Sequence, residues 1–317
     1  MRRPFVVLPS ILPARCPLDL SALGNCVIST SCLITQTTSG LIIGLLLFMV
    51  AAGVSLIFGV LKVVNFAHGT FYMLGAYFAY TAYQITGNYA AAVIAGGIGV
   101  AIFGLLFERL LISRVYGSPV LMQILVCYAV ILILDDVVKL VWGPDFLSFG
   151  MPETFQALPF VFAGGVVPVF YLFLIIVTLT IAALLGLLIT KTRYGKIIRA
   201  AAVNPTMVSA LGINTGIIYA SVFVLGGLLA GLAGGLAAPV RSLTAGMGLA
   251  VVIESFIVTV IGGMGSVAGA LVGSLLIGLV RSFGSIGFPL FTEGLMFLMM
   301  AVVLVLKPSG LFGKEGR

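Results

Sequence analysis

The sequence of 317 residues is 61% hydrophobic and only 8% charged, whereas soluble domains average about 45–50% and about 25%, so a soluble fold is excluded. Its net charge of +7 comes mainly from scattered basic residues without an extended basic face, which argues against nucleic-acid binding. A single histidine and four cysteines without paired spacing do not indicate a metal site. We therefore expect an all-α, polytopic transmembrane bundle, in which 40 glycines allow close helix packing.

Residues 1–39 differ in composition from the rest of the chain. Four prolines and the charged residues Arg15 and Asp19 interrupt the apolar run, so the segment resembles neither a spanning helix nor a signal peptide. We interpret it as an atypical N-terminal extension, disordered, or as the product of a start codon placed too early. Its side of the membrane is left unassigned.

The apolar runs that follow define a single transmembrane domain at 40–313, with a short tail at 314–317. A helix that crosses the hydrocarbon needs about 20 mostly apolar residues. Such runs lie at 41–61, 66–85, 90–112, 119–142, 166–190, 216–238, 267–283 and 289–306. A shorter apolar piece at 247–261 leaves about eight spans if it is re-entrant or joined to its neighbour, and nine if it crosses fully.

The beginning of the second span contains an amide and the only imidazole of the chain, Asn65 and His68. Polar groups inside a bilayer are costly, so they tend to face a cavity or a partner. We predict that Asn65, Phe66 and His68 line a translocation path. The alternative, in which Asn65 only caps the helix and His68 only bonds a neighbouring carbonyl, stays open.

A cluster of four basic residues follows the fifth span in a short loop: Lys191, Arg193, Lys196 and Arg199. The positive-inside rule predicts that 191–215 is cytoplasmic. Alternation backward brings three further basic residues to the same side, Lys62, Arg109 and Arg114. Counting forward with eight spans, we also expect the C-terminal basic residues there, Lys307, Lys314 and Arg317.

The cytoplasmic segment 192–213 is expected to form two short helices. The first presents an apolar side made of Ile197, Ile198, Ala201 and Ala202. Asn204 is expected to cap the second helix, Pro205 to occupy its first position and Gly212 to end it. We predict that the apolar side serves a protein partner; the alternative is a helix pair that lies on lipid headgroups.

The C-terminal third contains regular glycine series at Gly227, Gly231 and Gly235, and at Gly265, Gly269 and Gly273, which are typical of close helix contacts. The run Gly262, Gly263, Gly265 and Ser266 should break a helix, and a broken helix can line a transport path. Glu254, Arg281 and Glu293 lack a sequence-local partner, so each could line a cavity or pair between subunits. Of these, Glu254 joins the predicted path. Asp135 and Asp136 can be neutralised locally by Lys139.

Motifs of common enzymes are missing. Gly195-Lys196 is followed by Ile197, and Gly313-Lys314 by Glu315, so neither continues as a phosphate-binding loop. Nucleophile-elbow and metalloprotease motifs are also absent. We therefore expect a chain that is not an enzyme and binds no cofactor.

Several motifs, in this order, resemble the H-type permeases of branched-chain amino acid ABC transporters. They are Gly44 to Tyr80, which contains NFAHG, Leu140 to Asp145 (LVWGPD), Thr192 to Asn214, Val260 to Ala270 (VIGGMGSVAGA) and Lys307 to Gly313 (KPSGLFG). The resemblance covers about residues 40–313. It implies a multi-pass importer subunit of the bacterial inner membrane.

The partners that this resemblance implies are a homologous second permease or a second copy of the chain, two cytoplasmic ATPases that use ATP, and a periplasmic binding protein. The cytoplasmic helix pair would be the segment that couples to the ATPases. Its coupling residues would be Arg199, Ala200, Asn204, Pro205 and Gly212.

Branched-chain amino acids are the expected substrate. Similar permeases also serve urea, short amides and aromatic acids, which remain alternatives. An ion-driven secondary transporter with Glu254 as its ion site would share this composition, and so would a membrane scaffold without a path.

Overall fold

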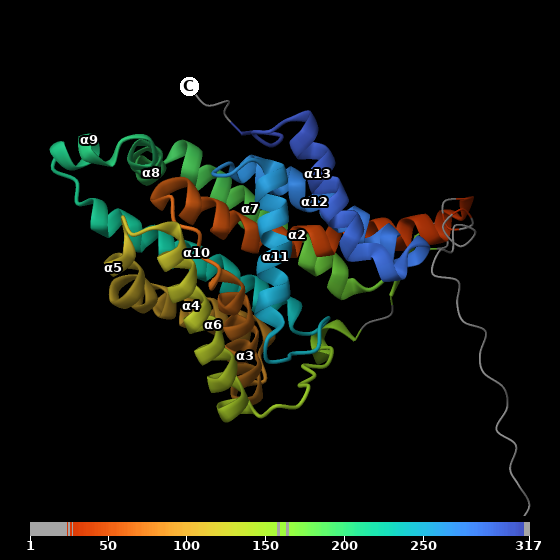
Figure 1. Ribbon diagram of the computed structural model, residues 1–317. Helices are drawn as coiled ribbons and strands as arrows, with labels where there is room; N and C mark the ends of the chain where they lie inside the picture. Colours follow the sequence, from red (N-terminus) through yellow and green to blue (C-terminus); the bar gives the residue numbers. More distant parts are fainter. Residues whose placement is uncertain (1–23, 25, 27, 157–158, 163–164, 314–317) are drawn as a thin grey trace, which may run out of the picture.

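The computed structural model describes residues 24, 26, 28–156, 159–162 and 165–313, which form a helical bundle (Figure 1). Its long helices are α2 (Thr30–Leu61), α3 (His68–Thr86), α4 (Tyr89–Phe107), α6 (Val120–Trp142), α7 (Val169–Lys191), α10 (Thr215–Ala237), α11 (Met247–Gly262), α12 (Val267–Gly287) and α13 (Thr292–Leu306). The expected all-α polytopic architecture is confirmed. The expected number of spans stays a prediction.

Short elements connect these helices. They are the π-helix η1 (Glu108–Ile112), α5 (Ser113–Val115), η2 (Glu153–Phe155), α8 (Arg193–Val203), α9 (Pro205–Ala210), η3 (Pro289–Phe291), and a hairpin of antiparallel strands β1 (Phe160–Phe162) and β2 (Gly165–Val167). Because η1 and α5 continue α4 without a break, one helical rod runs through Tyr89–Val115.

Six helical segments in the described part of the chain are long and apolar enough to cross a membrane: Thr30–Leu61, Tyr89–Val115, Val169–Lys191, Thr215–Ala237, Val267–Gly287 and Pro289–Leu306. The helices α3, α6 and α11 are not among them, and α11 is a shorter apolar helix of 16 residues. The segment expected at 247–261 is therefore a separate helix that packs on α2, α3 and α12.

The first helix is longer than its apolar run. It begins at Thr30 and includes residues 30–39, which the composition groups with the extension. Two contacts hold this polar turn: Ser282 on α12 donates a hydrogen bond of 2.7 Å to the carbonyl of Gln36, and Cys26 forms a disulfide with Cys32. Hydropathy alone misses the start of α2, because residues 30–39 are mostly polar and are held in the helix by these contacts.

Small residues bring the central helices together. A Cβ added at Gly44 of α2 would lie 2.7 Å from the carbonyl oxygen of Ser274 on α12. A Cβ at Gly231 of α10 would lie 2.8 Å from the carbonyl oxygen of Gly96 on α4, and one at Gly273 of α12 would lie 2.9 Å from the carbonyl oxygen of Val258 on α11. The first glycine series and the residues Gly269 and Gly273 of the second therefore act in close helix packing, as predicted, whereas Gly265 lies in the turn before α12 and not on a helix face.

The ends of α2 and α7 lie with α8 and α9 at one end of the bundle (Figure 1, upper left for α8 and α9), and we call this the basic end because these segments carry Lys62, Lys191, Arg193, Lys196 and Arg199. Gly265 faces Gly59 near the end of α2, and Leu311 donates a 2.8 Å hydrogen bond to Ile261 at the end of α11. The opposite end holds the hairpin, where Gly165 lies against Ile34.

The forward count of the spans needs a correction. Each complete crossing reverses the side, so eight crossings that begin opposite the basic end would also finish opposite it. In the structure, Lys307 reaches the basic end because α11 runs as a helix of its own between α10 and α12. Lys314 and Arg317 lie outside the described residues.

Candidate coupling surface and charged cavity

The helices α8 and α9 form a capped pair at the basic end. The Thr192 side chain accepts a hydrogen bond from the Gly195 amide at 3.1 Å, and Asn204 accepts one from the Met207 amide at 3.0 Å. Pro205 occupies the first turn of α9, and Gly212 has a φ of 81°, which favours glycine. The sequence prediction of two capped helices is confirmed.

The predicted apolar side of α8 is not available to a partner. Ile198 and Ala201 are 2% and 1% exposed, because α8 packs against α2, α7 and α10. Arg199 strengthens this attachment by donating a hydrogen bond to the carbonyl of Ile189 near the end of α7. The interpretation of this face as a docking surface is therefore wrong: the chain itself covers it.

A different apolar row faces outward. Val203, Met207 and Leu211 are 84%, 63% and 75% exposed. They follow one another at intervals of four residues, but α8 ends at Val203 and α9 begins at Pro205, so a search for helical periodicity does not connect them. Exposed apolar groups at the most basic end of a membrane protein favour a protein partner.

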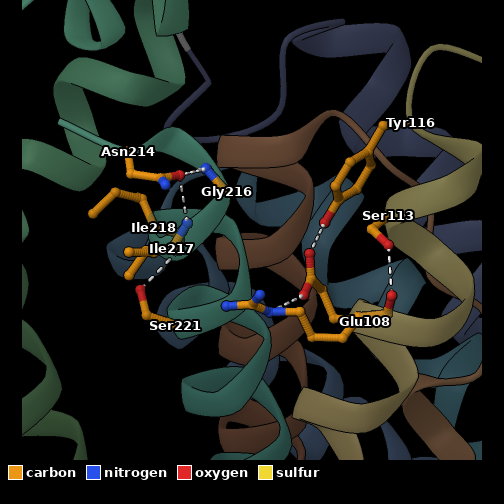
Figure 2. Close-up of polar contacts among 9 residues, drawn as sticks. Glu108, Ser113, Tyr116, Asn214, Gly216, Ile217, Ile218 and Ser221 are labelled. Atoms are coloured by element: carbon orange, nitrogen blue, oxygen red, sulfur yellow. Dashed lines mark hydrogen bonds and ion pairs between the residues drawn. The ribbon is translucent and has the colours of Figure 1, made fainter. Parts of the chain in front are cut away.

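A hollow of about 490 Å³ adjoins this helix pair, between η1 and the beginning of α10 (Figure 2). Glu108 lies on its floor, 2% exposed, and accepts a hydrogen bond of 2.7 Å from the Tyr116 hydroxyl. Arg109 lies 3.8 Å from the other carboxylate oxygen. Burial, and then the Glu108 carboxylate, raise the pKa of Tyr116, so its hydroxyl stays a donor.

The other wall of this hollow is the start of α10. Asn214 caps that helix by accepting hydrogen bonds from the Gly216 and Ile217 amides (Figure 2). The rings of Tyr116 and Tyr219 meet edge to face, with centroids 5.5 Å apart. Because α10 follows α9 directly, this contact links the helix pair to the rod that ends in α5.

The segment before α3 enters the interior of the bundle. The backbone is not helical between α2 and the turn at Phe66 and Ala67, and His68 is fully buried against Gly53 of α2 and Gly226 of α10. The backbone of Val50 on α2 is a hydrogen-bond partner for the His68 ring. Phe66 stacks on Phe256 at 4.8 Å.

Asn65 is also buried in this segment. Its side-chain oxygen accepts a 3.1 Å hydrogen bond from the Ala67 amide and lies 3.6 Å from the Cys127 sulfur. Asn65 thus stabilises the turn that begins α3, and this irregular backbone is enclosed by α2, α6, α10 and α11.

The glycine run after α11 forms a tight turn at the basic end. Gly263 and Gly265 have φ values of 96° and 87°, which only glycine adopts readily. Ser266 caps α12 by accepting a 3.0 Å hydrogen bond from the Gly269 amide. Gly262 packs against α12, so this turn joins α11, α12 and the C-terminal residues.

Glu254 lies elsewhere, in a cavity of about 220 Å³ between α2, α3, α7, α11 and α12. It forms an ion pair with Arg281 of α12, and the two side chains are 12% and 30% exposed. Arg241, which follows α10, also lines the cavity, together with apolar residues of α2. Glu293 does not line it, and Lys139 pairs with Asp136 at 2.9 Å outside it.

The structure therefore separates the residues that the sequence grouped into one path. Glu254 lines the charged cavity, Asn65 and His68 lie in the interior near α3, and Gly262 to Ser266 form the turn at the basic end. Sequence reasoning missed Arg241 because it follows a span and has no local pattern.

Comparisons with known proteins agree with this architecture. A family model described as branched-chain amino acid transport system, permease component, matches residues 36–305. The high-affinity branched-chain amino acid transport system permease protein BraD of Pseudomonas aeruginosa is 29% identical over 295 residues, covering 88% of this chain and 95% of BraD.

Two further relatives carry similar names. The permease protein LivH of Escherichia coli K12 is 27% identical over 301 residues, with 88% of this chain and 95% of LivH covered. The probable LivH of Methanocaldococcus jannaschii is 28% identical over 289 residues, with 85% and 89% covered. No solved structure matches.

Proposed function

This chain belongs to the family of permease components of the branched-chain amino acid transport system, and we propose that it is the membrane subunit of an ABC importer for branched-chain amino acids. It binds no cofactor of its own and depends on partner chains that hydrolyse ATP. Besides family membership, the observation that carries this proposal is the exposed apolar row of Val203, Met207 and Leu211 on a rigid, capped helix pair.

In this proposal α8 and α9 couple the bundle to a cytoplasmic ATPase. Asn204, Pro205 and Gly212 define the shape of the pair, while Arg199 fastens α8 to α7 and exposed Ala200 leaves room for the partner. A helix pair that is capped and attached transmits a displacement instead of absorbing it. Two ATPases, a homologous permease or a second copy of this chain, and a periplasmic binding protein complete the importer.

We place the basic end of the bundle in the cytoplasm of a bacterial inner membrane, so that 191–215 and the C-terminus are inside. The basic residues there follow the positive-inside rule. The Cys26–Cys32 disulfide at the opposite end favours an oxidising compartment such as the periplasm. Nine crossings place the basic end in the cytoplasm and the disulfide in the periplasm. They belong to one transmembrane domain that extends to residue 313.

The path would open by alternating access. The charged cavity with Glu254 belongs to the end away from the coupling helices, and the buried turn with Asn65, Phe66 and His68 lies between them. Gly262, Gly263, Gly265 and Ser266 would hold the α11–α12 turn while the bundle switches. Buried hydroxyl groups without a described partner, such as those of Ser55 and Thr70, fit a bundle that hydrates this region in another state.

Copurification from native membranes, combined with uptake by membrane vesicles, tests this function. The wild-type chain should bring two ATPase chains with it, and vesicles supplied with the binding protein should take up leucine only with ATP. Met207→Asp should lower ATPase recovery about tenfold or more, because it places a charge where the ATPase would otherwise bury an apolar side chain. Ile85→Asp is the matched control, an apolar residue 80% exposed at the opposite end, and should retain the ATPases.

Uptake driven by an ion gradient without ATP would contradict the importer and favour the secondary transporter. Equal ATPase recovery by Met207→Asp and wild type would contradict the role of the apolar row.

A further inference from the structure

The cavity around Glu254 combines charges and apolar walls in a way that matches one class of ligand. The Glu254–Arg281 pair and Arg241 belong to its lining, and Ile43, Leu46 and Val251 supply apolar surface. Its volume of about 220 Å³ is below the roughly 300–1,000 Å³ of pockets for drug-sized ligands. The occupant must therefore be small.

The charges exceed what packing requires. A partly buried ion pair contributes little net stability, and ionisable groups among membrane helices most often mark a transport route. Arg241 forms no ion pair with the residues that the structure describes. Arg281 neutralises Glu254, whereas Arg241, which hydrogen-bonds the Tyr72 side chain, keeps a positive charge for an anionic group.

We propose that this cavity binds a zwitterion with a small apolar side chain, as the entry site of the path. Arg241 binds the ligand carboxylate, and Glu254 binds the ligand ammonium group while Arg281 holds Glu254 in place. The apolar side chain lies against Ile43 and Val251. This inference rests on the proposed function. It selects amino acids over urea and amides, because urea and amides lack the carboxylate and ammonium groups that the charged side chains would bind.

The assembled transporter, reconstituted in proteoliposomes with its binding protein, provides the test. Arg241→Gln should lower ATP-dependent uptake of radiolabelled leucine about tenfold or more, since an ionic hydrogen bond is lost, and Arg241→Lys should recover part of it. The loaded binding protein should still stimulate ATP hydrolysis. Lys139→Gln, which removes a charge from the ion pair outside the cavity, should transport like wild type.

The double variant Glu254→Arg with Arg281→Glu separates ligand binding from structural support. It retains an ion pair between α11 and α12 but moves the carboxylate, so the complex should assemble while leucine uptake stays at least about tenfold reduced. Wild-type uptake by this variant would overturn the proposal and leave the pair a structural contact.

A further variant covers the case in which the charge changes prevent assembly. Ile43→Trp fills the cavity without removing a charge at a half-buried position, and it should also lower leucine uptake. Unchanged uptake by Ile43→Trp or by Arg241→Gln would overturn the site. If the wild-type complex imports no leucine, the proposed function fails; if it does and the variants match it, only the site assignment fails.

Discussion

At the scale of single residues, the buried carboxylate of Glu108 depends on one strong donor. Tyr116→Phe removes the 2.7 Å hydrogen bond and leaves a side chain that is 2% exposed with only the distant Arg109. An unsatisfied buried acceptor costs about 1–3 kcal/mol, so the purified chain should unfold at a lower temperature. Tyr128→Phe is the control, because Tyr128 is 51% exposed. Equal melting temperatures for the two variants would show that the contact is dispensable.

Residue-scale prediction from the sequence succeeded where the chemistry is local. Asn204 was expected to cap α9 and does so, since a cap and its amide are three residues apart. The sequence did not predict a partner for Glu254, because its partner Arg281 lies on another helix. Such a pair depends on the register between α11 and α12, which only tertiary packing determines.

At the scale of elements, the contact between α11 and α12 relies on the absence of side chains. A Cβ at Gly262 would lie 2.7 Å from the backbone nitrogen of Ala270, so Gly262→Ala must push the two helices apart. Overpacking of this kind costs about 1–3 kcal/mol. We expect a lower melting temperature and less leucine uptake.

Gly186→Ala on α7 provides the matched control for this substitution. No atom lies within 4 Å of the added Cβ, and alanine is favoured over glycine in a helix by about 1 kcal/mol. Its thermal stability should be unchanged or slightly higher. If both variants behave alike, the absence of a side chain at position 262 is not required for the contact between α11 and α12.

Most element boundaries followed from apolar runs, but the start of α2 and the orientation of the apolar face of α8 did not. The expected span at 119–142 is the helix Val120–Trp142, because hydropathy and helix length coincide there. The start of α2 was missed because residues 30–39 are polar and gain their support from α12. The apolar side of α8 was recognised, but periodicity does not reveal whether a face packs inward or outward.

At the scale of the whole molecule, the two ends of the bundle differ in charge and chemistry. Basic residues and the exposed row on α8 and α9 occupy one end, and the Cys26–Cys32 disulfide the other. A family resemblance predicted the function class, yet the sequence count of eight spans conflicted with a cytoplasmic C-terminus. Counting α11 as a crossing removes this conflict, and the membrane topology then becomes a direct test.

Single cysteines in a background without Cys16, Cys26, Cys32 and Cys127 report that topology. In intact cells a membrane-impermeant maleimide should label Ile85→Cys, at the end of α3 that we propose to be outside, and should label Thr206→Cys on α9 only after permeabilisation. Lys307→Cys decides the count: nine crossings place it inside with Thr206→Cys, whereas eight place it outside with Ile85→Cys. External labelling of Lys307→Cys, with Thr206→Cys still protected, would require α11 and α12 together to cross the membrane only once, although they are two separate helices.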